Sequence, residues 1–182
     1  MRRNDQAIAF TPLAEHEPGL VLSLLSRSYA PYLALDPQAS RAWPADWAAY
    51  DQEVFQRPDT VGACGFVTCL SGEPIGFASW DPRGRPTGII GHNCVLPAFQ
   101  GHGYGTVQIR RVLDILRRRG FEQVRVTTGD HLFFLPAQRM YQACGFREIE
   151  RGCRDPRVTL AMIDYLLVLP SNVPDTASAI HD

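Results

Sequence analysis

Residues 88–106 read GIIGHNCVLPAFQGHGYGT, an apolar run followed by three alternating glycines, Gly101, Gly103 and Gly105. The apolar run is typical of a buried central strand, and residues 104–119 place apolar side chains on one helical face and arginines largely on the other. Glycines between a strand and a helix allow a ligand to approach the backbone, and the free N–H groups at a helix start attract anions, typically phosphate. The stretch therefore predicts a phosphate-binding turn, with a flexible loop as the alternative.

Two common phosphate-binding motifs do not fit this turn. A nucleotide P-loop needs the pattern GxxxxGK[ST], and the chain contains no lysine at all. A dinucleotide fingerprint needs GxGxxG, whereas Gly105 follows Gly103 in the wrong register. The sequence thus excludes Walker-type hydrolysis of nucleotides and argues against a Rossmann-type site.

The remaining pattern, Gln-x-x-Gly-x-Gly at Gln100, Gly103 and Gly105, resembles the pyrophosphate loop of the GNAT acetyltransferase superfamily. Two further segments occur in the matching order, since residues 93–97 (NCVLP) resemble the family's fourth strand and residues 140–146 (MYQACGF) its Tyr-x-x-x-Gly-Phe segment. The resemblance implies an α/β (α+β) fold with a mixed, mostly antiparallel central sheet flanked by helices. In that fold, strands 4 and 5 splay apart to admit acetyl-coenzyme A.

The resemblance implies a cofactor site made largely of backbone groups. The strand before the loop pairs with the pantetheine arm, and the loop holds the pyrophosphate. The N–H of Val95 is expected to polarise the thioester carbonyl, as an oxyanion-stabilising donor does. The expected cofactor-binding residues are Asn93, Cys94, Val95, Gln100, Gly101, His102, Gly103, Tyr104, Gly105 and Thr106. Arg110 and Arg111 either meet the coenzyme's phosphates as well or form a solvated helix face.

Tyr141 occupies the position of the tyrosine that protonates the departing coenzyme A thiolate in the family. A phenol has an ordinary pKa near ~10 and stays protonated at neutral pH, while a thiol has one of about 8.5. The alternative is a packed tyrosine with a satisfied hydroxyl. No Asp or Glu lies in residues 88–96, so His92 is the expected general base, with His131 as a rival; the alternative for either is a hydrogen-bonded structural histidine. His92 and Asn93 face opposite sides of a strand, so one of the two points into the cleft.

Other residues leave alternatives open. Cys94 and Cys153 suggest a covalent acetyl-cysteine route, but a buried thiol is the commoner role and direct transfer is favoured. Phe134 stands where many family members carry an Asn that contacts pantetheine, so the resemblance does not extend to that contact. Residues 132–136 (LFFLP) either line an apolar wall of the cleft or pack beneath it, and core packing is favoured.

The acceptor side is less defined by the sequence. Five aromatic residues in the early part of the chain either floor an acceptor pocket or pack in the core: Tyr29, Tyr32, Trp43, Trp47 and Tyr50. Asp46, Asp51 and Glu53 either attract a cationic amine or are solvated helix charges. The acceptor is not identified.

Length and charge set the broader frame. The chain has 182 residues and a formal net charge of -1, so we expect one GNAT-like domain over residues 1–170, a flexible tail over 171–182, and no binding of nucleic acid or membranes. Five cysteines without a CxxC pair predict neither a disulfide framework nor a bound metal. We expect a cytoplasmic protein and leave a homodimer as one alternative for its assembly.

Periodicity and turn residues predict the other elements. Strands are expected at residues 7–10, 63–70, 75–80, 123–128 and 158–169, and helices at 18–32, around 43–55 and at 136–144. The predicted function is direct transfer of an acetyl group from acetyl-coenzyme A to a primary amine of a small molecule or protein. The alternative is a noncatalytic acyl-coenzyme A binding module or sensor on the same fold.

Overall fold

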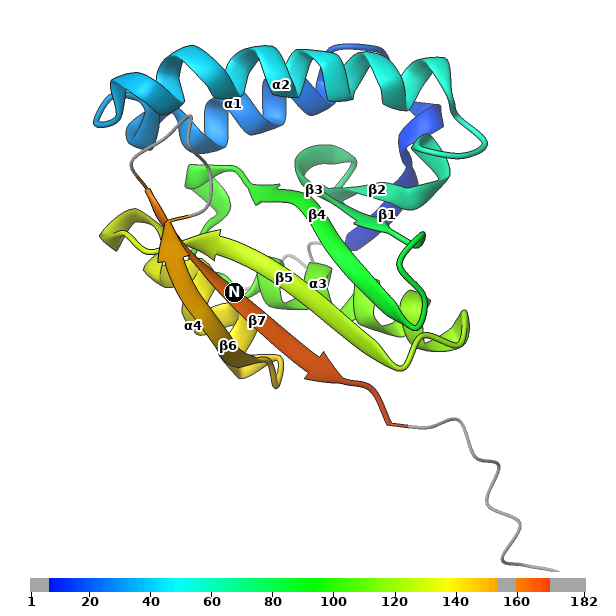
Figure 1. Cartoon of the computed structure of the whole chain (residues 1–182). Helices are drawn as coiled ribbons and strands as arrows, with labels where there is room; N and C mark the ends of the chain where they lie inside the picture. Colours follow the sequence, from blue (N-terminus) through cyan, green and yellow to red (C-terminus); the bar gives the residue numbers. More distant parts are fainter. Residues whose placement is uncertain (1–6, 154–159, 171–182) are drawn as a thin grey trace, which may run out of the picture.

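The computed structural model describes residues 7–153 and 160–170, which form a mixed sheet in the order β1-β2-β3-β4-β5-β7-β6 (Figure 1). Neighbouring strands run antiparallel except for β4 and β5, which are parallel. The strands are β1 (Ile8–Pro12), β2 (Gly65–Leu70), β3 (Glu73–Asp81), β4 (Thr87–Val95), β5 (Gln123–Gly129), β6 (Arg147–Cys153) and β7 (Ala161–Val168).

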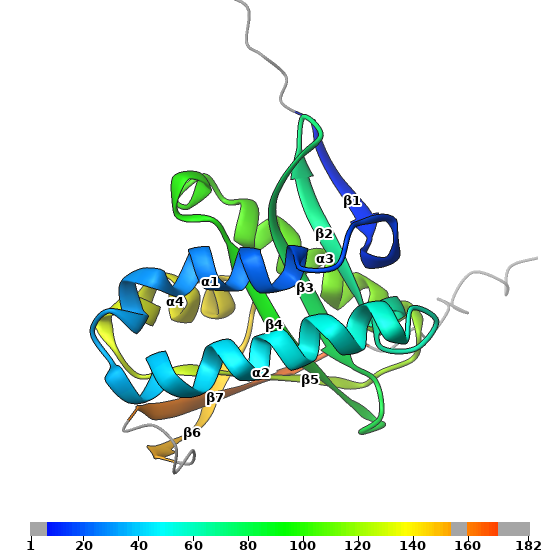
Figure 2. The same ribbon diagram turned by 90° about the horizontal axis from the view of Figure 1, so that it is seen from above.

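Helices cover both faces of the sheet. They are α1 (Leu20–Leu33), α2 (Pro37–Gln56), α3 (Tyr104–Arg118) and α4 (Leu135–Ala143). Figure 2, seen from above, shows α1 and α2 running side by side across the sheet. The apolar side chains of α3, among them Ile109 and Leu116, form one core with β4 and β5, while Leu24 and Trp47 belong to a second core on the face covered by α1 and α2. The sheet therefore separates two apolar layers, as alternating strand side chains require.

Local sequence explains where the helices begin and end. The carboxylate of Asp36 accepts hydrogen bonds from the backbone N–H groups of Gln38 and Ala39 at 2.9 and 3.0 Å, and Pro37 fits the first helical position of α2. Gly120 has a φ of 77° just after α3, a conformation that favours glycine. The aligned arginines of the last turn of α3 suit the negative end of the helix dipole.

The expected separation of the fourth and fifth strands is confirmed. β4 and β5 pair from Thr87↔Gln123 to Ile90↔Val126. Further along β4, residues 93–95 pair with β3 alone, up to Val95↔Gly76. A register shift in the pairing of β3 with β4 falls before Asn93. The two parallel strands thus share their first halves and part at their carboxyl ends.

Most of the predicted elements are present within a few residues of their expected bounds. β6 was not expected, because its sequence REIERGC alternates charges instead of apolar residues, as an edge strand often does. Of the expected strand 158–169, residues 158 and 159 lie outside the described residues, as does the expected tail 171–182. No helix in the described ranges is long and apolar enough to cross a membrane.

Candidate active site

A cleft of about 530 Å³ opens where β4 and β5 separate. Its walls come from α1, the end of β4, the glycine loop, the start of α3, β5 and α4. The structure brings nearly all of the expected site residues to this cleft: His92, Asn93, Cys94, Val95, Gln100, Gly101, Gly103, Tyr104, Gly105, Thr106 and Tyr141. His102 is exposed beside it, with its ring stacked on Tyr104 at 5.8 Å.

The glycine loop leaves the start of α3 open. Gly101 and Gly103 have φ values of 78° and 83°, which favour glycine, and a Cβ built on either would meet no atom within 4 Å. Gly103 is the N-cap of α3 and makes no side-chain cap bond, so the first N–H groups of the helix remain for an anion. The side chain of Gln100 donates to the carbonyl of Val95 at 2.8 Å and ties the loop to β4.

Gly105, which lines the cleft, also shapes the packing of α3. It lies inside α3, and a Cβ there would come within 2.8 Å of the sulfur of Met140 on α4. The missing side chain therefore allows α3 and α4 to approach each other at the wall of the cleft.

A buried glutamine that belongs to none of the sequence motifs holds α3 in place. The Nε2 group of Gln108 donates to the carbonyl of Phe77 at 2.9 Å, and its Oε1 accepts from the hydroxyl of Thr68 at 2.7 Å. Gln108 is 1% exposed, so these bonds are shielded from water. A polar residue on the apolar face of a predicted helix was the available signal.

The hydroxyl of Tyr141 is buried and paired with Asn93. The Nδ2 group of Asn93 donates to the Tyr141 oxygen at 3.0 Å, and that hydroxyl lies 3.3 Å from Asn93 Oδ1. Burial raises the pKa of Tyr141 to about 12, with the Asn93 hydrogen bond acting in the opposite direction. The hydroxyl of Tyr29 donates to the Asn93 carbonyl at 3.3 Å, so α1 and α4 both hold this point of β4.

His92 points to the other face of β4. Its ring lies 4.9 Å from the ring of Tyr50 on α2, and its carbonyl accepts from the hydroxyl of Ser79 at 3.0 Å. Burial lowers the pKa of His92, and the nearby charge of Asp46 partly offsets this. The imidazole is therefore neutral at neutral pH and able to accept a proton. His131 lies outside the cleft lining, and its Nδ1 accepts from the backbone N–H of Phe133 at 3.1 Å.

Cys94 and Phe134 are both buried. Cys94 is 7% exposed, and burial raises the pKa of its thiol to about 12, which disfavours the thiolate that a covalent route needs. The side chain of Cys153 lies outside the described part of the structure. Phe134 is buried and packs on Tyr32 at 4.9 Å, and it also lines the cleft.

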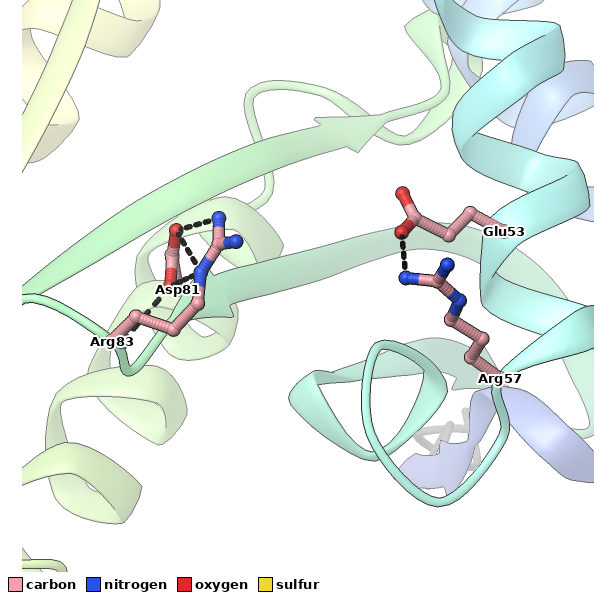
Figure 3. A network of polar contacts seen from close by, with 4 residues as sticks. All are labelled: Glu53, Arg57, Asp81 and Arg83. Atoms are coloured by element: carbon pink, nitrogen blue, oxygen red, sulfur yellow. Dashed lines mark hydrogen bonds and ion pairs between the residues drawn. The ribbon is translucent and has the colours of Figure 1, made fainter.

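The acidic residues proposed for the acceptor have other partners. Asp51 accepts from the backbone N–H groups of Gly19 and Leu22 at 2.7 and 3.1 Å and so caps α1. Glu53 forms an ion pair with Arg57 at 2.9 Å, shown in Figure 3 beside the pair between Asp81 and Arg83. The cluster of five aromatic residues is divided, because Tyr29 lines the cleft whereas Tyr32 and Trp47 are buried in the core.

Arg139 lines the cleft, whereas Arg110 and Arg111 of α3 do not. Arg139 of α4 lines the cleft and was missed in the sequence, where nothing distinguished it from other surface arginines. The guanidinium of Arg111 lies 5.9 Å from the ring of Phe10, and Arg110 lies beside the thiol of Cys144. Within residues 7–153 and 160–170, no three His, Cys, Asp or Glu side chains are placed to hold a metal ion.

The chain matches the model of the acetyltransferase (GNAT) family over residues 30–146, more than half of its length. None of the curated protein sequences matches it.

Solved structures share the fold at low sequence identity. A GNAT-family protein from Desulfovibrio desulfuricans is 18% identical and superposes with a TM-score of 0.68 over 89% of this chain and 98% of its own. YncA from Salmonella typhimurium, solved with its cofactor acetyl-CoA, is 19% identical, with a TM-score of 0.63 over 95% and 99%. The microcin C7 self-immunity acetyltransferase MccE, in complex with acetyl-CoA and AMP, is 16% identical, with a TM-score of 0.68 over 91% and 94%.

Proposed function

The chain belongs to the acetyltransferase (GNAT) family, and we propose that it transfers an acetyl group from acetyl-coenzyme A directly to a primary amine. The observation that carries the proposal is a single cleft that joins an uncapped helix start to a buried tyrosine hydroxyl. Structures of similar fold that contain acetyl-coenzyme A support the choice of acetyl donor.

The open start of α3 suits the diphosphate of the coenzyme. Backbone N–H groups of residues 104–106 converge there with the positive end of the helix dipole. Arg139 of α4 supplies a cation to the lining of the same cleft. The pantetheine arm then runs along the end of β4, where residues 93–95 have no pairing with β5 and can bind an extended ligand through their backbone.

The proposed reaction is a direct acyl transfer. The neutral amine attacks the thioester carbon, the new C–N bond forms, and the C–S bond breaks as the sulfur leaves with its electron pair. The Val95 N–H stabilises the charge on the carbonyl oxygen during attack. Tyr141 donates its proton to the departing thiolate. His92, which lines the cleft from the face of β4 opposite to Asn93, next to Tyr50 of α2, accepts the proton that the amine loses on that side.

Asn93 positions Tyr141 for this step. Its amide holds the hydroxyl from β4, on the strand that borders the thioester. The Tyr29 hydroxyl in turn fixes the Asn93 carbonyl. We therefore assign Asn93 an orienting role, in addition to the backbone contact with the coenzyme.

Turnover distinguishes this proposal from a noncatalytic acyl-coenzyme A binding module. The test is the release of free thiol from acetyl-coenzyme A in the presence of a panel of primary amines. We expect amine-dependent release that falls about 100-fold in Tyr141→Phe. Tyr165→Phe is the matched control, because Tyr165 is also buried but does not line the cleft. Saturable coenzyme binding without thiol release for any amine would favour the binding module.

We propose that the protein works in a reducing compartment such as the cytoplasm. Four cysteines of the described residues are free thiols, which such a compartment favours: Cys64, Cys69, Cys94 and Cys144. Cell fractionation with an antibody to the chain tests this location. Sedimentation of the purified chain distinguishes a monomer from a homodimer.

A further inference from the structure

The part of the cleft on the α1 side of the sheet differs from the part near the glycine loop. It is lined by Ser28 and Tyr29 of α1 and by Phe133 and Phe134, which precede α4. On β4, Cys94 faces the same core as α1 and α2, away from α3. A coenzyme whose diphosphate lies at α3 reaches this region with its thioester end, so an acceptor amine meets the acetyl group there.

Three aromatic rings form one wall of this region, which we call the aromatic wall. The ring of Tyr29 lies 5.9 Å from that of Phe133 and 6.2 Å from that of Phe134, and the two phenylalanine rings are 4.9 Å apart. The three side chains come from two segments far apart in the sequence, α1 and the turn before α4, and all three line the cleft. Rings held in this way offer an apolar surface that suits a flat or aliphatic body.

Negative charge is missing from the lining. No Asp or Glu within the described residues lines the cleft. The nearby acids are engaged elsewhere, since Asp36 caps α2 and Asp164 binds Arg125 at 2.9 Å and Thr127 at 2.7 Å. A polycationic acceptor would therefore find no carboxylate in the cleft to compensate its charges.

The Ser28 hydroxyl borders the cleft and has only a weak partner. Ser28 is 4% exposed, and its Oγ lies beside the weakly polar thiol of Cys94, with no nitrogen or oxygen partner among the described residues. A buried hydroxyl with a thiol as its one neighbour gains from a stronger partner on a ligand. The amine of an acceptor seated against the aromatic wall supplies such a partner.

We propose that the acceptor is a primary amine on a single apolar body of about the size of an aromatic ring, with that body against Tyr29, Phe133 and Phe134 and the amine near Ser28. The inference rests on the proposed acetyl transfer. A free arylalkyl amine and the first residue of a peptide share this chemistry, and the test separates them.

The test compares kcat/KM, corrected for the fraction of neutral amine, for 2-phenylethylamine, ethylamine, spermidine and a tripeptide that begins with phenylalanine. We expect kcat/KM for 2-phenylethylamine or for the tripeptide to exceed those for ethylamine and spermidine at least tenfold. Whichever of the two is preferred identifies the source of the acceptor. Equal or better use of spermidine or ethylamine overturns the inference while leaving acetyl transfer intact. Absence of thiol release with every amine overturns the proposed function itself.

Variants locate the preference in the wall. Phe133→Ala and Tyr29→Leu are each expected to reduce the preference to less than threefold. Phe133→Ala should do so without changing the KM for acetyl-coenzyme A, whereas Tyr29→Leu also removes the hydroxyl that holds the Asn93 carbonyl and should lower kcat as well. Ser28→Ala is expected to raise the KM for the preferred amine several-fold. Phe99→Ala is a crossed control, because Phe99 lines the cleft beside the glycine loop and should change only the KM for acetyl-coenzyme A. Thermal melting shows that each variant is folded. A preference that survives both changes in the wall contradicts the proposal.

Discussion

The contact between Asn93 and Tyr141 allows a quantitative test of how the leaving group is protonated. Asn93→Ala removes the two polar contacts, of 3.0 and 3.3 Å, between the Asn93 amide and the Tyr141 hydroxyl. Tyr141 is 2% exposed, so water cannot readily replace them. A neutral hydrogen bond contributes about 1 kcal/mol net, so loss of this orientation should raise the barrier by about 1–2 kcal/mol. That corresponds to a fall in kcat of about 5–30-fold.

A double-mutant cycle separates orientation from general damage. Thiol release is measured at saturating acetyl-coenzyme A and amine for the wild type, Asn93→Ala, Tyr141→Phe and the double variant. Because Asn93 acts through the hydroxyl that Tyr141→Phe removes, the double variant should be as slow as Tyr141→Phe alone. If Asn93→Ala slows the Tyr141→Phe enzyme by the same factor as the wild type, the two residues act independently and the reasoning is wrong.

Three further predictions address the strand, the base and the thiol. A Cβ at Gly76 would come within 2.2 Å of the Cys94 carbonyl oxygen. Gly76→Ala should therefore lower the free energy of unfolding, measured by urea denaturation, by about 2 kcal/mol or more. Gly152→Ala is the control and should have little effect, because a Cβ at Gly152 meets no atom within 4 Å. Because burial lowers the pKa of His92, kcat/KM corrected for the fraction of neutral amine should fall only below about pH 6.5, as His92 gains a proton. His92→Asn should remove this fall at low pH. If kcat/KM of the variant still falls in the same pH range, His92 is not the base. Cys94→Ala should retain kcat within about threefold of the wild type, because burial disfavours the Cys94 thiolate. Mass spectrometry of the wild type incubated with acetyl-coenzyme A alone should detect no acetylated enzyme. An acetylated Cys94 peptide would establish the covalent route instead.

The glycine loop was predictable from the sequence, because three glycines between a strand and a helix indicate a turn with positive φ values that leaves the helix start open to a ligand. The sequence also predicted the separation of β4 and β5, through the family resemblance, and the structure confirms it. β6 was missed, since charges on an edge strand give no apolar alternation. Whether His92 or Asn93 faces Tyr141 was not readable, because a register shift within the β3–β4 pair changes the side to which each residue points.

Contacts across the sheet were also beyond the sequence. The position of Ser28 in the cleft depends on how α1 lies over β4, and that of Arg139 on how α4 turns beside α3. Gln108 carried a weak signal, a polar residue on an otherwise apolar helix face, but its partners Thr68 and Phe77 are far from it in the chain. Such contacts follow from tertiary packing, which local propensity does not fix.

The central claim is that the open helix start at Gly103 binds the coenzyme's diphosphate, and isothermal titration calorimetry with acetyl-coenzyme A tests it most directly. Gly103→Val and Gly120→Val make a matched pair, because both sites have positive φ values, 83° and 77°, at opposite ends of α3, and only Gly103 lines the cleft. We predict saturable binding by the wild type, equal binding by Gly120→Val, and affinity at least tenfold weaker in Gly103→Val. Absence of binding by the wild type, or equal affinity in the two variants, would contradict the account.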